Sequence, residues 1–228
     1  MMNELKIITT EDGSHSLYNT NLKETYHSFH GAVQESKYVF IKQGLDYLRS
    51  NSELKQINVL EVGFGTGLNA VLTAEWAREN EVKVNFTTLE PFPVSEDIFI
   101  ALNYSQFFTR SEIQKDFLAL HYAEWEGWFM LSPFFSMLKT EKKLQGFESE
   151  GTFDVIFFDA FAPNKQAELW AFDTLAKTVG FLSKGGVLVT YCAQGQFKSD
   201  LASLNLLVQT LPGPPGKKEM VRGLNVGE

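Results

Sequence analysis

Hydrophobic and polar residues along the chain form blocks that predict strands separated by helices. Continuous apolar stretches, which suit buried strands, lie at 57–61, 82–89, 153–158 and 186–191. Apolar positions at helical spacing occur between them, at 68–78, 94–102 and 168–179. This order is typical of a mostly parallel sheet with helices on both faces, so we predict an α/β fold.

The two ends of the chain differ from this alternation. Short apolar runs at 5–8 and 17–18 flank Glu11-Asp12-Gly13 and predict a hairpin, and a helix should follow over 34–48. The runs at 206–211 and 218–222 enclose a Pro/Gly loop and predict an antiparallel hairpin at one edge of the sheet. We therefore divide the chain into an N-terminal extension, 1–50, and a core domain, 51–228.

Residues 107–150 have no clear period. Aromatic residues crowd into this stretch without regular alternation. We interpret the segment as an elaborated crossover that packs its aromatic side chains on the sheet, and keep a substrate-facing lid as the alternative.

Composition limits the classes of protein to which the chain can belong. A single cysteine, Cys192, excludes a disulfide framework and favours a reducing compartment, and no uncharged apolar run reaches membrane-spanning length. We therefore expect a soluble, cytoplasmic protein. The 20 Lys and Arg against 28 Asp and Glu give a net charge of −8, which argues against broad attraction to nucleic acid. The 20 phenylalanines indicate a large apolar core or an aromatic pocket.

A glycine-rich turn follows the first strand of the core. Gly63, Gly65 and Gly67 stand where an open α/β sheet binds ligands, just before a helix. Their spacing is one residue shorter than the G-x-G-x-x-G of dinucleotide sites, which disfavours a nicotinamide dehydrogenase. Glu90, at the end of the next strand, is placed to accept hydrogen bonds from ribose hydroxyls and indicates a nucleoside. The alternative is a purely structural turn beside a solvated glutamate.

A second candidate group follows the strand at 153–158. Asp159 should border the same crevice, because the carboxyl ends of adjacent parallel strands meet at one edge of the sheet. Phe161-Ala162-Pro163 after it would form a stiff apolar wall for a flat substrate. Asp159 could instead cap the loop that follows the strand. We favour a functional carboxylate.

Several segments together resemble a known family. They are Gly63-Phe64-Gly65-Thr66-Gly67-Leu68-Asn69, Glu90-Pro91-Phe92-Pro93, Phe158-Asp159-Ala160-Phe161-Ala162-Pro163 with Trp170, and Lys217-Lys218-Glu219-Met220. They are similar to the methyltransferase domain of the bifunctional tRNA 5-methylaminomethyl-2-thiouridine biosynthesis enzyme. Tyr26-His27-Ser28, Gly31-Ala32, Glu35-Ser36 and Val39-Phe40 resemble stand-alone members that lack the oxidase domain. The resemblance extends from about residue 12 to residue 223.

The resemblance implies a Rossmann-like class I methyltransferase that uses S-adenosylmethionine to methylate the aminomethyl group of a tRNA wobble uridine. It implies Asp159 as the catalytic residue that faces the substrate amine. The residues that would hold the cofactor are Glu61, Gly63, Phe64, Gly65, Thr66, Gly67, Asn69 and Glu90. A separate oxidase would act upstream.

Substrate contacts are expected from apolar and basic residues near these motifs. Phe161 and Pro163 would face the base, and Lys165, Lys217, Lys218 and Arg222 are the candidate tRNA contacts, although these cations could equally form a solvated edge. The sequence departs from the family at 142–146: it has Lys143 where members carry an acidic residue for the adenine amino group. His27 and His30 lack further ligands at metal-site spacing and are expected to be ordinary hydrogen-bonding residues.

Two rival functions remain open from the sequence. One is a small-molecule or protein methyltransferase on the same scaffold, which the acidic net charge favours, since a fold does not determine its substrate. The other is a binding module that has lost the cofactor, which the change at Lys143 would fit. If RNA is the substrate, contact should be local, through an extruded base in an aromatic pocket.

Overall fold

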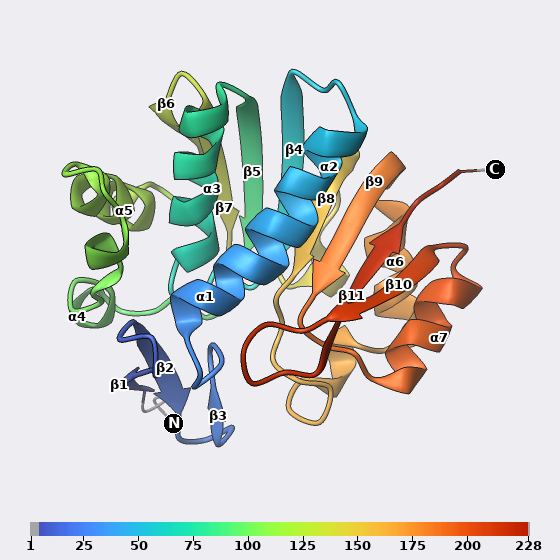
Figure 1. The fold of residues 1–228 in the computed structure, drawn as a ribbon, viewed down its shortest axis with the longest axis horizontal. Coiled ribbons are helices and arrows are strands. Elements are labelled where there is room, and N and C mark those ends of the chain that lie inside the picture. The colour runs from blue at the N-terminus through green and yellow to red at the C-terminus, as the bar shows by residue number, and fades with distance from the viewer. Residues whose placement is uncertain (1–4, 228) are drawn as a thin grey trace.

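One eight-stranded sheet organises the protein, whose computed structural model describes residues 5–227 (Figure 1). The strand order is β10-β11-β9-β8-β4-β5-β7-β6. Five neighbouring strands run parallel: β4 (Gln56–Val62), β5 (Lys83–Leu89), β7 (Phe135–Thr140), β8 (Phe153–Phe158) and β9 (Leu182–Thr190). The sheet confirms the predicted α/β class with a mostly parallel sheet.

Antiparallel strands close both edges of this sheet. β10 (Leu207–Pro212) and β11 (Glu219–Leu224) form the C-terminal edge hairpin that the sequence predicts, and β11 pairs with β9. At the other edge β6 (Trp128–Ser132) pairs with β7. This second antiparallel edge was not predicted.

Helices cover the two faces of the sheet as separate layers. One face carries α3 (Leu68–Asn80), α5 (Ile113–Tyr122) and a continuous helix made of α1 (Ala32–Ser36), the π-helical segment η1 (Lys37–Asp46) and α2 (Tyr47–Asn51). The other face carries α6 (Phe172–Gly180) and α7 (Gly195–Ser203). Along β8, Val155 and Phe157 belong to the first core and Ile156 and Phe158 to the second, so the strand is buried on both sides.

The N-terminal extension begins as a small sheet of its own. β1 (Leu5–Thr9) pairs with β2 (His15–Asn19) as the predicted hairpin, and β2 pairs with the short β3 (Glu24–Thr25). In Figure 1 this sheet lies below the main sheet, on the side where α3 begins. The division of the chain at residue 50 stays a prediction. The helix over 32–51 spans this boundary and packs directly on the main sheet.

Three sequence predictions need correction. The helix expected at 94–102 is a single turn, α4 (Glu96–Phe99), and the helix expected at 168–179 is a 3-10 turn, η4 (Ala167–Leu169), followed by α6. The segment 107–150 is more regular than a crossover with aromatics: it holds the end of η2 (Tyr104–Phe107), α5, β6, β7 and η3 (Leu144–Gly146). Strand β7 escaped the prediction because the buried Lys139 continues the inward-facing row of Phe135 and Met137 and breaks its apolar pattern.

The register of three central strands sets the position of the site. Val62 of β4 is level with Leu89 of β5 on one side and with Phe158 of β8 on the other. The residues that follow these strands therefore meet at one edge of the sheet. Across the described part of the chain, none of the helices is long and apolar enough to cross a membrane.

The continuous helix of the extension approaches the sheet through Gly44. A Cβ at this position would lie 3.2 Å from Phe157 Cε1 and 3.3 Å from Val189 Cγ2, tighter than ordinary contacts. Beside it, Trp76 Nε1 of α3 donates a hydrogen bond to Asp46 Oδ1 at 2.8 Å. Helix and sheet are thus packed as one core.

This close packing gives a test of whether the extension is part of the folding unit. Replacing Gly44 by leucine should lower the free energy of unfolding by about 1–3 kcal/mol, because the added side chain overpacks the core. Gly180→Leu is the matched control, since a Cβ on that helical glycine meets nothing within 4 Å. Urea unfolding of both variants measures the difference; equal stabilities would show that the helix is only loosely docked.

Candidate active site

Glycines let the turn after β4 approach its neighbours closely. Gly63 has φ +98°, and a Cβ there would lie 2.6 Å from the backbone oxygen of Asp159. Gly65 has φ +50°, and its N–H donates to Glu90 Oε2 at 2.9 Å. Both are conformations that residues with a side chain rarely adopt. The turn thus brings the ends of β4, β5 and β8 into one site.

Gly67, the third glycine, serves a different purpose. It has φ +73°, and a Cβ on it would lie 2.7 Å from Nε2 of His121 on α5. His121 Nε2 lies 3.1 Å from the carbonyl oxygen of Thr66, and its ring stacks on Phe99 at 4.3 Å between centroids. Burial lowers the pKa of His121 to about 4, so the ring is neutral and can donate to this carbonyl. Gly67 therefore makes room for a side chain that supports the turn from behind.

Glu90 lies at the centre of the predicted cofactor site. Its Oε1 accepts the N–H of Phe92 at 3.0 Å while its Oε2 accepts that of Gly65. Burial raises the pKa of Glu90, against these two hydrogen bonds. Its carboxylate is oriented by the backbone and borders the cavity, as an acceptor for ribose hydroxyls should.

Of the predicted cofactor residues Glu61 and Asn69, only Asn69 lines the cavity. Glu61 is fully buried and does not line the cavity; its Oε2 accepts a hydrogen bond from Thr88 Oγ1 at 2.6 Å. Burial raises the pKa of Glu61 to about 8. Asn69 does line the cavity, and its Nδ2 donates to Asp159 Oδ2 at 2.8 Å. Glu61 thus supports the site from beneath rather than facing it.

Asp159 follows β8 and faces the same cavity as the glycine turn, as the strand order predicts. Its backbone N–H donates to the oxygen of Val62 at 3.1 Å, which continues the pairing of β8 with β4. Burial raises the pKa of its carboxyl to about 7; Glu35 raises it further, whereas the hydrogen bond from Asn69 and the charge of Lys217 lower it. A carboxylate with this pKa can take up a proton near neutral pH.

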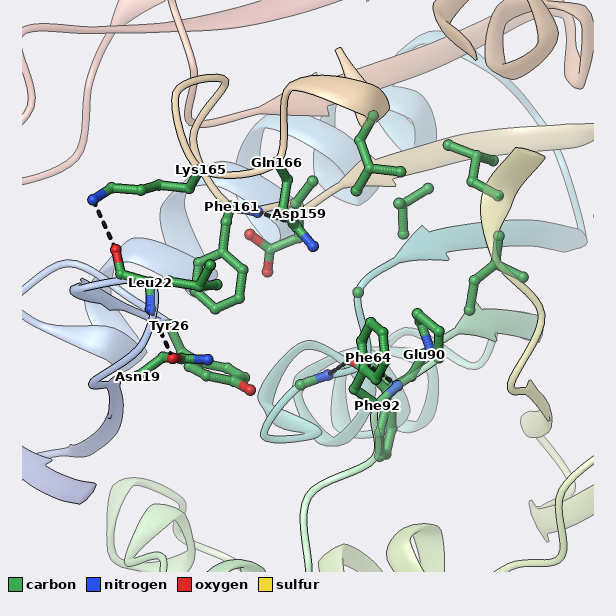
Figure 2. A pocket seen from close by; sticks show the side chains of 18 of the residues that line it. Asn19, Leu22, Tyr26, Phe64, Glu90, Phe92, Asp159, Phe161, Lys165 and Gln166 are labelled. Carbon is green, nitrogen blue, oxygen red and sulfur yellow. Dashed lines mark hydrogen bonds between the residues drawn. The ribbon is translucent and has the colours of Figure 1, made fainter. Parts of the chain in front are cut away.

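The cavity between these residues has a volume of about 600 Å³ and is partly covered by the extension. Figure 2 shows the ring of Phe161 beside that of Tyr26, with centroids 5.0 Å apart and planes nearly perpendicular. Lys165 Nζ donates to the carbonyl oxygen of Leu22 at 2.8 Å and so joins the loop after β8 to the extension. The predicted substrate residues Phe161 and Lys165 therefore line the cavity, whereas Pro163 is not among its lining residues.

The other predicted tRNA contacts do not form one exposed patch. Arg222 is only 7% exposed: its Nε donates to Gln209 Oε1 at 2.9 Å, and its guanidinium lies 3.5 Å from the centroid of the Tyr47 ring. Lys217 forms an ion pair with Glu35 at 2.6 Å. Lys218 is exposed. Arg222 is thus a packing residue, and the expectation that it contacts tRNA is corrected.

The segment that departs from the family pattern does border the cavity. Lys143, Leu144 and Gln145 line it at η3, opposite the extension. A carboxylate is nearby in another segment, because Glu168 lines the cavity and its backbone oxygen accepts a hydrogen bond from Gln145 Nε2 at 3.3 Å. Of the segment 107–150, only this part reaches the cavity, so the alternative of a lid formed by the aromatic stretch is not supported.

Three residues of the site were not given a role from the sequence. Tyr26 and Glu35 come from the extension, and Tyr191 follows β9. Tyr26 and Tyr191 line the cavity, and Glu35 lies behind it. Tyr26 and Glu35 fall in segments that resemble stand-alone family members, and this resemblance is the feature of the sequence that could have identified them as site residues. Of the histidines, His27 contacts Ser16 at 3.1 Å and His30 contacts Glu11 at 2.7 Å.

The residues present fit S-adenosylmethionine. The glycine turn has a cradle that side chains would fill, and Glu90 offers an oriented carboxylate for a ribose. Asn69 Oδ1 is buried without a hydrogen-bond partner at the cavity wall, as expected for an oxygen that a ligand donor completes. The residues that would hold the cofactor are Gly63, Phe64, Gly65, Thr66, Asn69 and Glu90, all of which line the cavity.

Comparison with known proteins supports this assignment. A family model described as S-adenosyl-L-methionine-dependent methyltransferase matches residues 137–225. The tRNA 5-methylaminomethyl-2-thiouridine biosynthesis bifunctional protein MnmC of Leptospira interrogans is 31% identical over 215 residues, which cover 88% of this chain and 32% of the relative. MnmC of Campylobacter hominis is 27% identical and covers 90% of this chain and 31% of the relative. The chain thus spans about a third of the length of these curated relatives.

Solved structures agree with the sequence comparison. The crystal structure of MNMC2 from Aquifex aeolicus superposes with a TM-score of 0.80 at 27% identity, covering 98% of this chain and 71% of that chain. DesVI of Streptomyces venezuelae, at 12% identity and a TM-score of 0.50, shares the fold alone. The chain therefore belongs to the S-adenosyl-L-methionine-dependent methyltransferases and is related to the methyltransferase part of MnmC.

Proposed function

We propose that the protein methylates the aminomethyl group of the modified wobble uridine in tRNA, the final step to 5-methylaminomethyl-2-thiouridine. The observation that carries this proposal is the shared cavity: Asp159 faces the same space as the glycine turn and Glu90. The names of the MnmC relatives support this choice of substrate. S-adenosylmethionine, when bound, supplies a methyl group on a positively charged sulfur that a neutral amine can attack.

The chemistry requires an amine with a free lone pair. An alkylamine with a pKa near 10.4 is mostly protonated at pH 7, and freeing its lone pair costs about 4–5 kcal/mol. Burial beside apolar rings lowers the pKa of an amine because it disfavours the charged form. Phe161 and Tyr26 provide such surroundings at the cavity wall.

Asp159 would orient the amine and receive its proton. Asn69 Nδ2 donates a hydrogen bond to Oδ2 of this carboxylate and fixes its orientation. A pKa of about 7 means that the carboxylate is ionised above that pH and able to accept a proton. Below that pH the carboxyl is already protonated and cannot accept the proton of the amine, and more of the amine is present as ammonium, so turnover should rise as the pH increases through 7.

Contact with tRNA would be local. Exposed cations at the cavity are Lys143, which lines it, and Lys23, next to the lining residue Leu22, while the net charge of the chain is −8. An extruded base that stacks on aromatic side chains requires few phosphate contacts. The aminomethyl precursor would come from a separate oxidase acting upstream, and we place the reaction in the cytoplasm.

A methyltransferase that acts on a small amine or on a protein is the second candidate. The acidic net charge favours it, as does the internal packing of Arg222. The same Asp159 and aromatic wall would serve any primary or secondary amine. The two candidates differ in whether RNA is needed for turnover.

The role of Glu90 can be tested by binding alone. Glu90→Gln should weaken S-adenosylmethionine binding about 10- to 100-fold, because a hydrogen bond to a charged acceptor contributes about 1.5–3 kcal/mol. Isothermal calorimetry measures the affinity. Glu79→Gln, on the exposed side of α3, is the control and should bind as the wild type does. Unchanged affinity in Glu90→Gln would remove the carboxylate from the cofactor site.

The role of Asp159 can be tested by separating binding from turnover. Asp159→Asn should keep cofactor affinity within a few-fold while slowing methyl transfer at least tenfold, because the amide cannot accept the proton. Single-turnover rates measure the loss, and Asp173→Asn on the surface of α6 serves as the control. Near-normal turnover in Asp159→Asn would contradict the assignment.

The substrate itself is tested with RNA. The purified protein, S-adenosylmethionine and tRNA that carries the aminomethyl uridine should yield the methylaminomethyl nucleoside, detected by mass spectrometry after digestion. Unmodified tRNA is the control. Methylation of small amines at comparable rates without tRNA would favour the second candidate, and an unchanged nucleoside profile would reject the tRNA reaction.

A further inference from the structure

An ion pair between a partly exposed lysine and a buried glutamate lies against the wall of the cavity. Lys217, from the loop between β10 and β11, places Nζ 2.6 Å from Oε1 of Glu35 in α1. The same ammonium lies 3.5 Å from the centroid of the Tyr191 ring. The second oxygen of Glu35 accepts the N–H of Ser28 at 2.6 Å. Glu35 is buried at 4% exposure, so its charge is compensated inside the protein rather than by water.

The pair adjoins the end of the cavity that holds Asp159. Tyr191 lines the cavity, and its hydroxyl donates to the carbonyl oxygen of Ala160 at 2.8 Å, next to Asp159 in the chain. Asp159 and the ring of Tyr191 therefore both line this end of the cavity, and the ammonium of Lys217 lies over the face of the Tyr191 ring. Glu35 and Lys217 act on the Asp159 carboxyl with opposite signs, since Glu35 raises its pKa and Lys217 lowers it.

Two buried titratable groups of this region, Glu61 and His27, are mostly neutral at neutral pH. Burial raises the pKa of Glu61 to about 8, and burial lowers the pKa of His27 to about 4, so both are mostly neutral. Burial also raises the pKa values of Tyr26, Tyr191 and Cys192, which keeps these groups uncharged. The carboxylate of Glu90 is bound by the N–H groups of Gly65 and Phe92, and Lys165 directs Nζ to the carbonyl oxygen of Leu22. Among the charged groups that line or adjoin the cavity, Glu35 and Lys217 are the two whose charges act on the Asp159 carboxyl.

We infer that Lys217 and Glu35 are positioning residues whose paired charges set the protonation of Asp159 and of the substrate amine. This inference rests on the proposed function for its consequence in turnover. Lys217 compensates the buried Glu35, so Asp159 can be ionised without a second unpaired carboxylate beside it. Lys217, a predicted tRNA contact whose side chain stays partly exposed, thereby has a role beside the amine site as well.

The two residues should have opposite effects when removed. Without Lys217, the uncompensated Glu35 favours protonated Asp159 and also stabilises ammonium on the substrate. Both changes move the onset of activity to higher pH. Without the charge of Glu35, Lys217 favours ionised Asp159 and a neutral amine, and the onset moves to lower pH. A residue that only holds the fold together does not produce shifts of opposite sign.

The first experiment measures Asp159 directly. Carbon-13 NMR titration of the aspartate carboxyls, assigned with Asp159→Asn, gives its pKa without any need for turnover. K217M should raise it by about one pH unit and E35Q should lower it by about one, as expected for a unit charge at short range. The double variant E35Q/K217M should return close to the wild-type value. Shifts in the same direction, or none, would overturn the inference.

Matched variants separate charge from folding. K218M removes an adjacent but exposed lysine and should leave the Asp159 titration unchanged. K217R keeps the charge and should keep the titration. If K217M alone does not fold, E35Q and E35Q/K217M still decide the outcome, since both avoid leaving Glu35 unpaired.

The second experiment follows methylation of aminomethyl-uridine tRNA across the pH range. The acid limb of the kcat profile should move up in K217M and down in E35Q. If the wild type does not methylate this RNA but the titrations shift as stated, the proposed function fails and the charge pair stands. If the wild type is active and the titrations do not move, the charge pair fails and the function stands.

Discussion

The meeting of three strand ends without an intervening side chain is the constraint on which the site depends. Because Gly63 has no Cβ, the turn after β4 can pass against the backbone of Asp159, whose N–H bonds to Val62. On the other side the N–H of Gly63 donates to the oxygen of Leu89, just before Glu90. A side chain at this position would separate the glycine turn from Asp159, and the two would no longer border one cavity.

The fold could be predicted where a repeated local pattern exists. Strands β4, β5 and β8, the turn at Gly63 and the acids Glu90 and Asp159 follow from apolar runs and the strand-end rule. Strand β7 could not be predicted, because the buried Lys139 is stabilised by the backbone oxygen of His121 and the ring of Trp125, contacts that no local pattern reveals.

In the candidate site, too, some residues can be predicted from local patterns and others cannot. Residue types indicate which side chains can carry charge, but not which of them another segment will bury. Lys217 and Arg222 are cations near a Pro/Gly loop and thus resemble an RNA edge. The ion pair of Lys217 with Glu35 and the stacking of Arg222 on Tyr47 depend on the docking of the extension. The extension therefore supplies residues that cover the cavity and also the carboxylate of Glu35, which pairs with Lys217 behind it.

Gly67 has a consequence for how sequence changes in this family should be interpreted. Its missing Cβ leaves room for His121, a residue 54 positions away on α5. A smaller residue at position 121 would relieve this contact, but an alanine in the turn would still have to adopt the φ of +73° that residues with a side chain rarely adopt. The third glycine is therefore required twice, by the backbone conformation of the turn and by the side chain on α5, so a change at His121 alone does not release it.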